Sequence, residues 1–293
     1  MAKMVLSSGY GTVNLNGIAE DGFGAQVLSG VSGMGLPPIS AQWNEGAGNG
    51  ATYRGGRILS RDLDLPIDFY GRDRTDLKDI LRNFALVVQG GCRLVFIEDS
   101  GTDSWYLDVH LIGGGDVIYG QDTIGRRELN TVVTFRSGKP LWTKEQVQTH
   151  VIRQDSGSAD PFLPDFMSMP LASSQALGDI QFENIGDAPA YPTWIVHGPY
   201  DDFTFTSAEG EFFTREVAAT NTEVTRIDTE LGVPVEWDES TPNTIDTINL
   251  YFTPVPKYWT VPPGLSSANI TISNATSETY VICSWSPRKW VVV

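Results

Sequence analysis

The residues of this chain that could do acid–base or metal chemistry are carboxylates and histidines. Asp62 and Asp64 stand two residues apart, and Asp201 and Asp202 are adjacent. Paired carboxylates are what a glycoside hydrolase or a calcium site requires. Nothing in the sequence brings two of these acids together in a cleft. We therefore interpret them as solvated positions on strands and in turns.

The remaining reactive side chains form no motif. The three histidines, His110, His150 and His197, are too few and too scattered for a metal site, and we expect His110 and His197, which fall in strands, to be solvated. Cys92 and Cys283 lie in apolar, strand-like runs and are expected to be buried thiols. There is no nucleophile elbow, zinc-protease motif or phosphate-binding loop. We predict no enzyme, and no catalytic, cofactor-binding or metal-binding residue.

The first half of the chain has the two-residue period of half-buried strands. Leu63, Leu65, Ile67 and Phe69 alternate with polar residues, and the stretches 105–111 and 129–135 alternate in the same way. Short strands at near-regular spacing predict a sandwich or a barrel.

One segment changes to the helical period. Its apolar residues follow one helical face, at positions Leu77, Ile80, Leu81, Phe84 and Val88. We predict one amphipathic helix over residues 75–89, with Thr75 or Asp73 as N-cap and Gly90 just past its end. A helix within a β unit is expected to plug an open edge of the sandwich.

A glycine-rich stretch, Asn44–Gly56, precedes these elements. It has two interpretations: a mobile surface loop, or a long hairpin arm that orders against a neighbouring subunit. Trp43, Tyr53, Arg54 and Arg57 near its ends are residue types that anchor interfaces, so they are candidate interface residues.

A new sandwich begins in mid-chain. A short strand around Phe182 stops at the turn Gly186–Pro189, and a second strand runs from Pro192 to Gly198-Pro199. At 293 residues, two domains are expected. We predict a mainly β protein of two consecutive β-sandwich domains, over residues 1–142 and 180–293, joined by a connecting segment over residues 143–179. Within that segment, 143–153 favours a strand over a short helix, and 156–177 is expected to be irregular.

The charge is acidic and uneven. The net charge is −16, and residues 1–140 contain 13 Lys+Arg and 16 Asp+Glu against 7 and 20 in residues 141–293. Such a chain repels phosphate backbones, so sequence-specific nucleic-acid binding is disfavoured. No apolar run approaches the roughly 20 residues of a membrane-spanning helix, and the N-terminus lacks the pattern of a secretory signal.

Taken together, the chain resembles the siphophage distal tail protein (Dit) family, also called phage tail-component or minor tail proteins. The likeness covers nearly the full length. It is carried by Asn184–Pro192 with the following 194–199, the turn 208–210, and Val224–Thr229 leading into Gly232. The first half adds the glycine-rich arm before Arg57, the helix, and the closing 139–142.

The resemblance implies a belt-like β-sandwich with a helix, through which six copies close into a ring, and an outward galectin-like second sandwich. It implies a structural protein of the virion tail tip that is assembled in the host cytoplasm. The partners implied are other copies of the chain, the tail tube protein, the tape-measure protein and a tail-associated lysin or tip protein. The genome crosses the ring, and no membrane is entered.

Two alternatives remain. The second sandwich could be a carbohydrate-binding module for host-surface glycans, using Trp194, Trp237, Tyr258 or Trp259 if exposed. A sandwich-fold glycoside hydrolase is disfavoured, because no acid pair can be identified.

Overall fold

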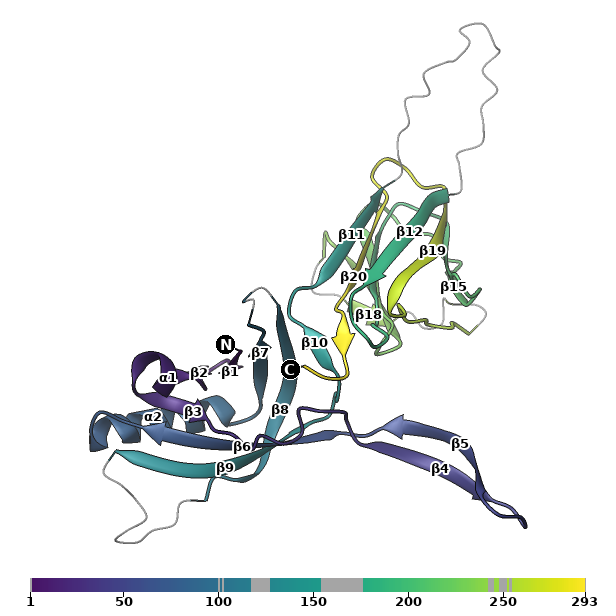
Figure 1. Ribbon diagram of the computed structural model, residues 1–293. Helices are drawn as coiled ribbons and strands as arrows, with labels where there is room; N and C mark the ends of the chain where they lie inside the picture. The colour runs from purple at the N-terminus through teal and green to yellow at the C-terminus, as the bar shows by residue number, and fades with distance from the viewer. Residues whose placement is uncertain are drawn as a thin grey trace, which may run out of the picture. The chain divides into compact units, whose positions relative to one another are not determined.

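The computed structural model describes residues 2–99, 101, 103–116, 127–153, 176–241, 245–247, 252 and 255–292. It is 56% strand and 8% helix, which confirms the expected mainly β class. The chain divides into two compact units (Figure 1): unit 1 is Met1–Gln146 with Arg288–Val293, and unit 2 is Val147–Pro287. Neither of the two helices in the described part of the chain is long and apolar enough to cross a membrane.

Unit 1 consists of a nine-stranded sheet that curls around one core and a separate two-stranded sheet formed by the strands Ile39–Glu45 and Ala51–Ile58. The strands are β1 (Lys3–Ser8), β2 (Gly11–Asn14), β3 (Gly24–Val27), β4 (Ile39–Glu45), β5 (Ala51–Ile58), β6 (Arg61–Tyr70), β7 (Cys92–Ile97), β8 (Ser104–Gly114), β9 (Glu128–Ser137), β10 (Trp142–Lys144) and β21 (Arg288–Lys289). The main order is β2-β1-β7-β8-β9-β6-β3. Asn16, just after β2, bridges Gln26 of β3, so the two ends of this order meet. This closure protects the sheet edges.

Strand β8 is shared by the two halves of this sheet. Its first residues pair with β7 and its last with β9, with a register shift between Leu111 and Gly113. The expected alternation holds up to this shift, because Trp105, Leu107 and Val109 are each 1% exposed. It fails at Leu111, which is 44% exposed, because β8 there passes from one half of the sheet to the other.

Helix α2 (Arg74–Val88) matches the predicted helix. Asp73 is the N-cap, and its carboxylate accepts hydrogen bonds from the backbone N–H groups of Thr75 (2.8 Å) and Asp76 (2.9 Å). Gly90 follows the helix with φ +83°, as expected for a residue after a helix end. The helix contacts β1 and β2 at one end of the sheet order and β3 and β6 at the other, so it packs against both ends of the sheet.

The expectation of one helix in this unit is wrong. A second, α1 (Gly17–Asp21), lies between β2 and β3 and ends at Gly22, whose φ is +78°. Five residues are too few to show a helical period in the sequence.

The unit boundaries differ from those expected from the sequence. β11 (Gln148–Arg153), within the expected connecting segment, is a strand of unit 2 that pairs with β20, whereas residues 154–175 of that segment lie outside the described residues. At the other end, the last six residues return to unit 1, where β21 pairs with β10. This pairing joins residues far apart in sequence, so no local pattern could have predicted it.

Buried contacts hold the returning C-terminal segment. Arg61, 1% exposed, donates hydrogen bonds to the backbone carbonyls of Gly33 (3.0 Å), Met34 (3.1 Å) and Trp290 (2.7 Å). Burial lowers the pKa of Arg61 to about 10. Val292 is 2% exposed and belongs to the core of unit 1. The end of the chain is therefore a structural part of the first unit.

We expect Val292→Ala to lower the free energy of unfolding of unit 1 by about 2 kcal/mol, because it removes buried apolar surface and leaves a cavity. Val132→Ala is the matched control, since Val132 lies in the same unit and is 51% exposed. It should cost less than about 1 kcal/mol. Denaturant titration measures both. Equal effects would show that the C-terminal segment is not packed in this core.

Unit 2 is a sandwich of two antiparallel sheets. Its strands are β11, β12 (Ala176–Asn184), β13 (Thr193–His197), β14 (Asp202–Ser207), β15 (Phe212–Arg215), β16 (Glu223–Asp228), β17 (Val233–Asp238), β18 (Ile245–Thr247), β19 (Gly264–Ser273) and β20 (Tyr280–Trp285). One sheet has the order β11-β20-β13-β16-β17-β18, and the other β12-β19-β14-β15. The sequence Ile-Asn-Leu-Tyr-Phe over residues 248–252 predicts a further strand, of which only Phe252 lies within the described residues.

Asn184 explains the turn motif at the start of this sandwich. Its side chain is buried, and its amide donates to the backbone carbonyls of Ala188 (3.1 Å) and Val261 (3.0 Å). Its side-chain oxygen accepts from the N–H of Gly186 at 3.0 Å. One side chain therefore closes the turn and ties it to a distant segment. An apolar residue at 184 would leave the backbone carbonyls of Ala188 and Val261 and the N–H of Gly186 without these partners.

A polar network crosses the interior of unit 2. Arg215 of β15, 1% exposed, donates to Tyr200 Oη and Glu236 Oε1, each at 2.5 Å, and to Thr225 Oγ1. Tyr200 Oη and Thr225 Oγ1 are 2.8 Å apart. Because Arg215 belongs to one sheet and Thr225 and Glu236 to the other, this network links the two layers.

Because of this network, we expect unit 2 to lose stability at alkaline pH. Burial raises the pKa of Tyr200 from 10.0 to about 12, and Arg215 offsets part of this rise. The folded state holds the Tyr200 phenol proton more tightly than the unfolded state does. The stabilisation that the protonated Tyr200 gives is therefore complete below about pH 10 and is lost as the pH rises toward about 12. The stability difference between the wild type and Tyr200→Phe should shrink by roughly 2–3 kcal/mol over that range. A constant difference in denaturant titrations would contradict this.

Candidate assembly interface

The glycine-rich arm is a β-hairpin. β4 and β5 pair with each other from Ile39↔Ile58 to Glu45↔Ala51 and form a separate two-stranded sheet. Among the described residues no third strand joins them, so each strand has one open edge. All seven residues of β4 are exposed. In Figure 1 the hairpin extends from the beginning of β6. The sequence left open whether this stretch is a surface loop or a hairpin, and the structure shows a hairpin.

The hairpin has one apolar and one polar face. Cross-strand partners share a face, so Ile39, Ala41 and Trp43 of β4 lie beside Ile58, Gly56 and Tyr53 of β5. The other face carries polar pairs, including Ser40↔Arg57 and Asn44↔Thr52. A lone two-stranded hairpin is marginally stable in water, and an uncovered apolar face adds to that deficit.

Trp43 and Tyr53 form the centre of the apolar face. Their ring centroids lie 5.2 Å apart in an edge-to-face contact, and they are 61% and 54% exposed. Tyr53 lies over Gly56, where an added Cβ would come within 2.8 Å of the tyrosine Oη. Ile39, 55% exposed, flanks the same glycine. The result is a preformed aromatic and aliphatic patch that is open to solvent.

The two arginines lie apart from this pair. The register shifts between Gln42 and Trp43, and this leaves Arg54 as the extra residue of a bulge, while Arg57 lies on the polar face opposite Ser40. Both are exposed, and within the described residues neither makes an ion pair. Of the four candidate residues, the structure therefore brings together Trp43 and Tyr53. Sequence reasoning missed Ile39, Ile58 and Gly56, although alternation along 39–43 could have indicated the first.

The carboxylates considered for catalysis have structural partners. Asp62 accepts two hydrogen bonds from Arg136, at 2.6 and 2.8 Å, which lower the pKa of this carboxyl group. Asp64 accepts from Ser32 Oγ (2.9 Å) and Thr134 Oγ1 (2.8 Å). These bonds orient the two acids toward neighbouring segments of the sheet.

The histidines and cysteines are far from forming a metal centre. No group of three or more His, Cys, Asp or Glu that could hold an ion occurs in the described part of the chain. The expectation of a solvated His197 is wrong: its side chain is 14% exposed and stacks on Tyr280 with centroids 4.0 Å apart. Burial lowers its pKa. Cys92 and Cys283 are free and buried, as predicted.

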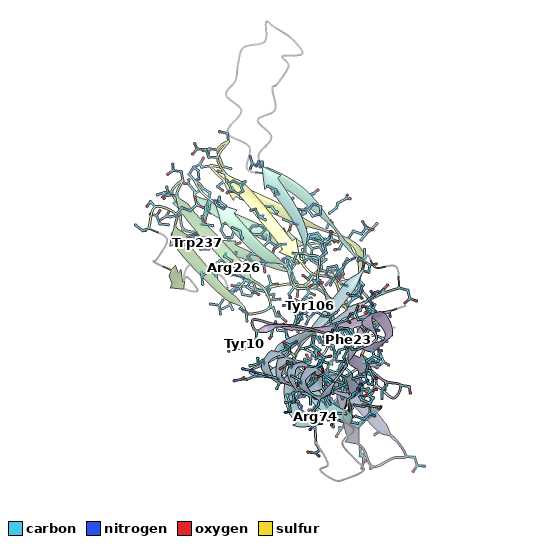
Figure 2. All side chains as sticks on the ribbon, turned by 90° about the vertical axis from the view of Figure 1, so that its left-hand side faces the viewer. Tyr10, Phe23, Arg74, Tyr106, Arg226 and Trp237 are labelled. Atoms are coloured by element: carbon cyan, nitrogen blue, oxygen red, sulfur yellow. The ribbon has the colours of Figure 1, made fainter. Side chains whose placement is uncertain are left out.

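Of the aromatic residues considered for sugar stacking, two belong to the core. Trp194 is 0% exposed and Trp259 is 5% exposed, and their ring centroids lie 5.6 Å apart. Tyr258 is half-buried. Trp237 is also half-buried and lies on β17, where it pairs with Val224 of β16 (Figure 2).

No protein-family model matches the chain. No curated protein sequence matches it either. Among solved structures, it is similar to the Dit (gp 19.1) protein of phage SPP1, described as a paradigm of the hub adsorption apparatus in phages that infect Gram-positive hosts. The TM-score is 0.62 at 13% identity, over 98% of this chain and 99% of that one. It is also similar to chains of the phage P2 baseplate in its activated conformation, with Ca (TM-score 0.56) and with Sr (0.53), each at 8% identity over all of both chains.

These similarities establish the fold. Across both units, the chain has the fold of phage distal tail and baseplate hub proteins, and this confirms the resemblance drawn from the sequence motifs.

Proposed function

We propose that this protein is a structural component of the distal tail of a long-tailed phage, without enzymatic activity. Copies of it form a ring, with six subunits as the expected number, which joins the tail tube to the baseplate or tip and lets DNA pass. The observation that carries the proposal is the match of both units to phage hub proteins over 98–100% of the chain.

The hairpin supports assembly through unit 1. In a cyclic ring one surface patch meets a different patch of the next subunit. The apolar face of β4–β5, with Trp43 and Tyr53, is such a patch, and its open strand edges can add to a neighbouring sheet. On this proposal Arg54 and Arg57 form the polar rim of the contact. Unit 1 forms the ring, and unit 2, galectin-like in the proposal, docks other virion proteins.

The charge distribution fits this division of roles. Residues 147–287 contain 4 Lys+Arg and 19 Asp+Glu, while unit 1 has 16 and 17. A nearly neutral unit 1 carries little charge repulsion into a contact between identical copies. The partners proposed beside other copies are the tail tube protein, the tape-measure protein and a tail-associated lysin or tip protein, in a virion assembled in the host cytoplasm.

Light scattering after size-exclusion chromatography, over a range of protein concentrations, tests the ring. We expect a mass of about six subunits at high concentration, and rings in negative-stain images. Immunogold labelling of virions should mark the tail tip. A monomer at every concentration together with unlabelled tails would overturn the proposal.

A further inference from the structure

The nine-stranded sheet of unit 1 carries an exposed apolar surface of its own, outside the hairpin. Pro66 of β6 pairs with Val132 of β9, and the Pro66 carbonyl accepts a hydrogen bond from the N–H of Leu28, just after β3, at 2.8 Å. Cross-strand partners share a face, so these three side chains form a row across neighbouring segments. Leu28 is 41% exposed, Val132 is 51% exposed and Pro66 is half-buried. We call this row the apolar stripe.

The stripe lies on the face of the sheet opposite the core. The residues on both sides of Pro66 are 0% exposed, and the residue after Val132 is 1% exposed, so their side chains point inward. Next to Val132, just after β8, lies Gly115, whose N–H donates to the Val132 carbonyl at 2.8 Å. Because glycine has no side chain, this flank of Val132 is open to a partner.

Acidic side chains border the stripe along β6. Asp62, Asp64 and Asp68 alternate with the buried residues of this strand, so they lie on the same face as the stripe. Arg136 pairs with Asp62, whereas Asp64 and Asp68 make no ion pair with any residue that the structure describes. Burial and the negative charge of Glu128 raise the pKa of Asp68. The border therefore carries an excess of negative charge.

The hairpin has the complementary chemistry. Arg54 and Arg57 both belong to β5, which contains no acidic residue. The apolar face of the hairpin runs from Ile39 to Trp43, about 13 Å along a strand, and the stripe crosses three segments, about 10 Å. The two surfaces are thus similar in length and opposite in charge. Both are exposed in the same subunit, so neither covers the other there.

We infer that the apolar stripe receives the hairpin of the next subunit. This inference rests on the proposed ring and identifies the second patch that a contact between unlike surfaces requires. Trp43 and Tyr53 of one copy pack on the stripe of its neighbour, and the β5 edge, with its two arginines, lies along the acids of β6. A hairpin that met another hairpin would instead use one patch twice and give a two-fold dimer.

Disulfide cross-linking between two full-length variants tests this contact. Ala41→Cys places a thiol on the apolar face of the hairpin, and Val132→Cys places one on the stripe. The native thiols of Cys92 and Cys283 are buried, so they should not compete. After mixing and mild oxidation we expect a linked heterodimer, with little linkage in either variant alone. Linkage of Ala41→Cys to itself would show a contact between hairpins and overturn the inference.

Two matched controls use other exposed positions of unit 1. Asn44→Cys changes the polar face of the same hairpin and should not link to Val132→Cys. Leu86→Cys changes a residue of α2 that is 41% exposed and should not link to Ala41→Cys. Equal yields in these mixtures would mean that the linkage reports random collision, and this would also overturn the inference.

A charged substitution gives a measurement that does not depend on cross-linking. Val132→Glu should weaken association by at least about ten-fold, because it places an unpaired charge in an apolar contact. Leu86→Glu should leave association unchanged. Both side chains are exposed, so the subunit should fold in each case. Unchanged association of Val132→Glu, or no linkage in protein that does assemble, would overturn this inference and leave the ring intact. A monomer at every concentration would overturn both proposals.

Discussion

Replacing Arg215 with methionine is expected to destabilise unit 2 by about 3–5 kcal/mol, the typical cost of removing one partner of a buried ion pair. Methionine keeps much of the stem volume and removes the guanidinium. Glu236, whose side chain is 16% exposed, would then be left with a poorly solvated charge, and Tyr200 and Thr225 would lose a donor. Denaturant titration, followed by the fluorescence of the core tryptophans, measures the change.

Arg226→Met is the control for this prediction. Arg226 lies on β16, in the same sheet as Glu236, its side chain is 49% exposed, and its Nη2 is 3.7 Å from the carboxylate of Asp228. Surface pairs of this kind contribute at most about 1 kcal/mol. The double variant Arg215→Met with Glu236→Met should recover part of the loss, because no charge remains unpaired. If Arg215→Met costs no more than Arg226→Met, the network does not stabilise the sandwich.

Replacing Trp43 and Tyr53 with alanine is expected to prevent assembly and leave the single subunit folded. Each is an exposed aromatic at the centre of the hairpin's apolar face. Aromatic anchors of interfaces typically contribute about 2 kcal/mol or more, so each single change should weaken association by roughly 30-fold. The melting temperature of the isolated subunit should hardly change, because neither ring is buried in it. Analytical ultracentrifugation and thermal melts measure the two effects.

Two control variants distinguish the effect of removing the apolar face from the effect of changing any exposed side chain. Asn44→Ala changes the polar face of the same hairpin, and Tyr10→Ala removes an aromatic that is 67% exposed outside it (Figure 2). Both should assemble like the wild type. Normal assembly by Trp43→Ala and Tyr53→Ala would exclude this face as the subunit contact.

Local patterns in the sequence predicted the elements that bury one regular face. The alternation over 63–69 predicted β6, in which all four apolar residues are at most 1% exposed. The helical period, with Asp73 before it and Gly90 after it, predicted α2 to within one residue at each end. Both succeed because periodicity and capping are properties of a few neighbouring residues.

The arm could be only half predicted. Its glycines indicated a departure from the core, and the flanking aromatics indicated an interface. The bulge at Arg54, which keeps Tyr53 on the same face as Trp43, depends on the register between two strands. A one-residue change in register would have moved the tyrosine to the polar face.

By itself, the sequence determined the class of the protein: mainly β, with one long helix, two sandwiches and buried thiols. These follow from apolar spacing, which acts over a few residues. Only the tertiary structure decided that residues 288–293 complete unit 1, that Arg215 links two sheets, and that Asn184 ties its turn to Val261. Each of these features joins residues distant along the chain. The free energy of such contacts comes from burial and pairing in the folded chain, and no short stretch of sequence contains that information.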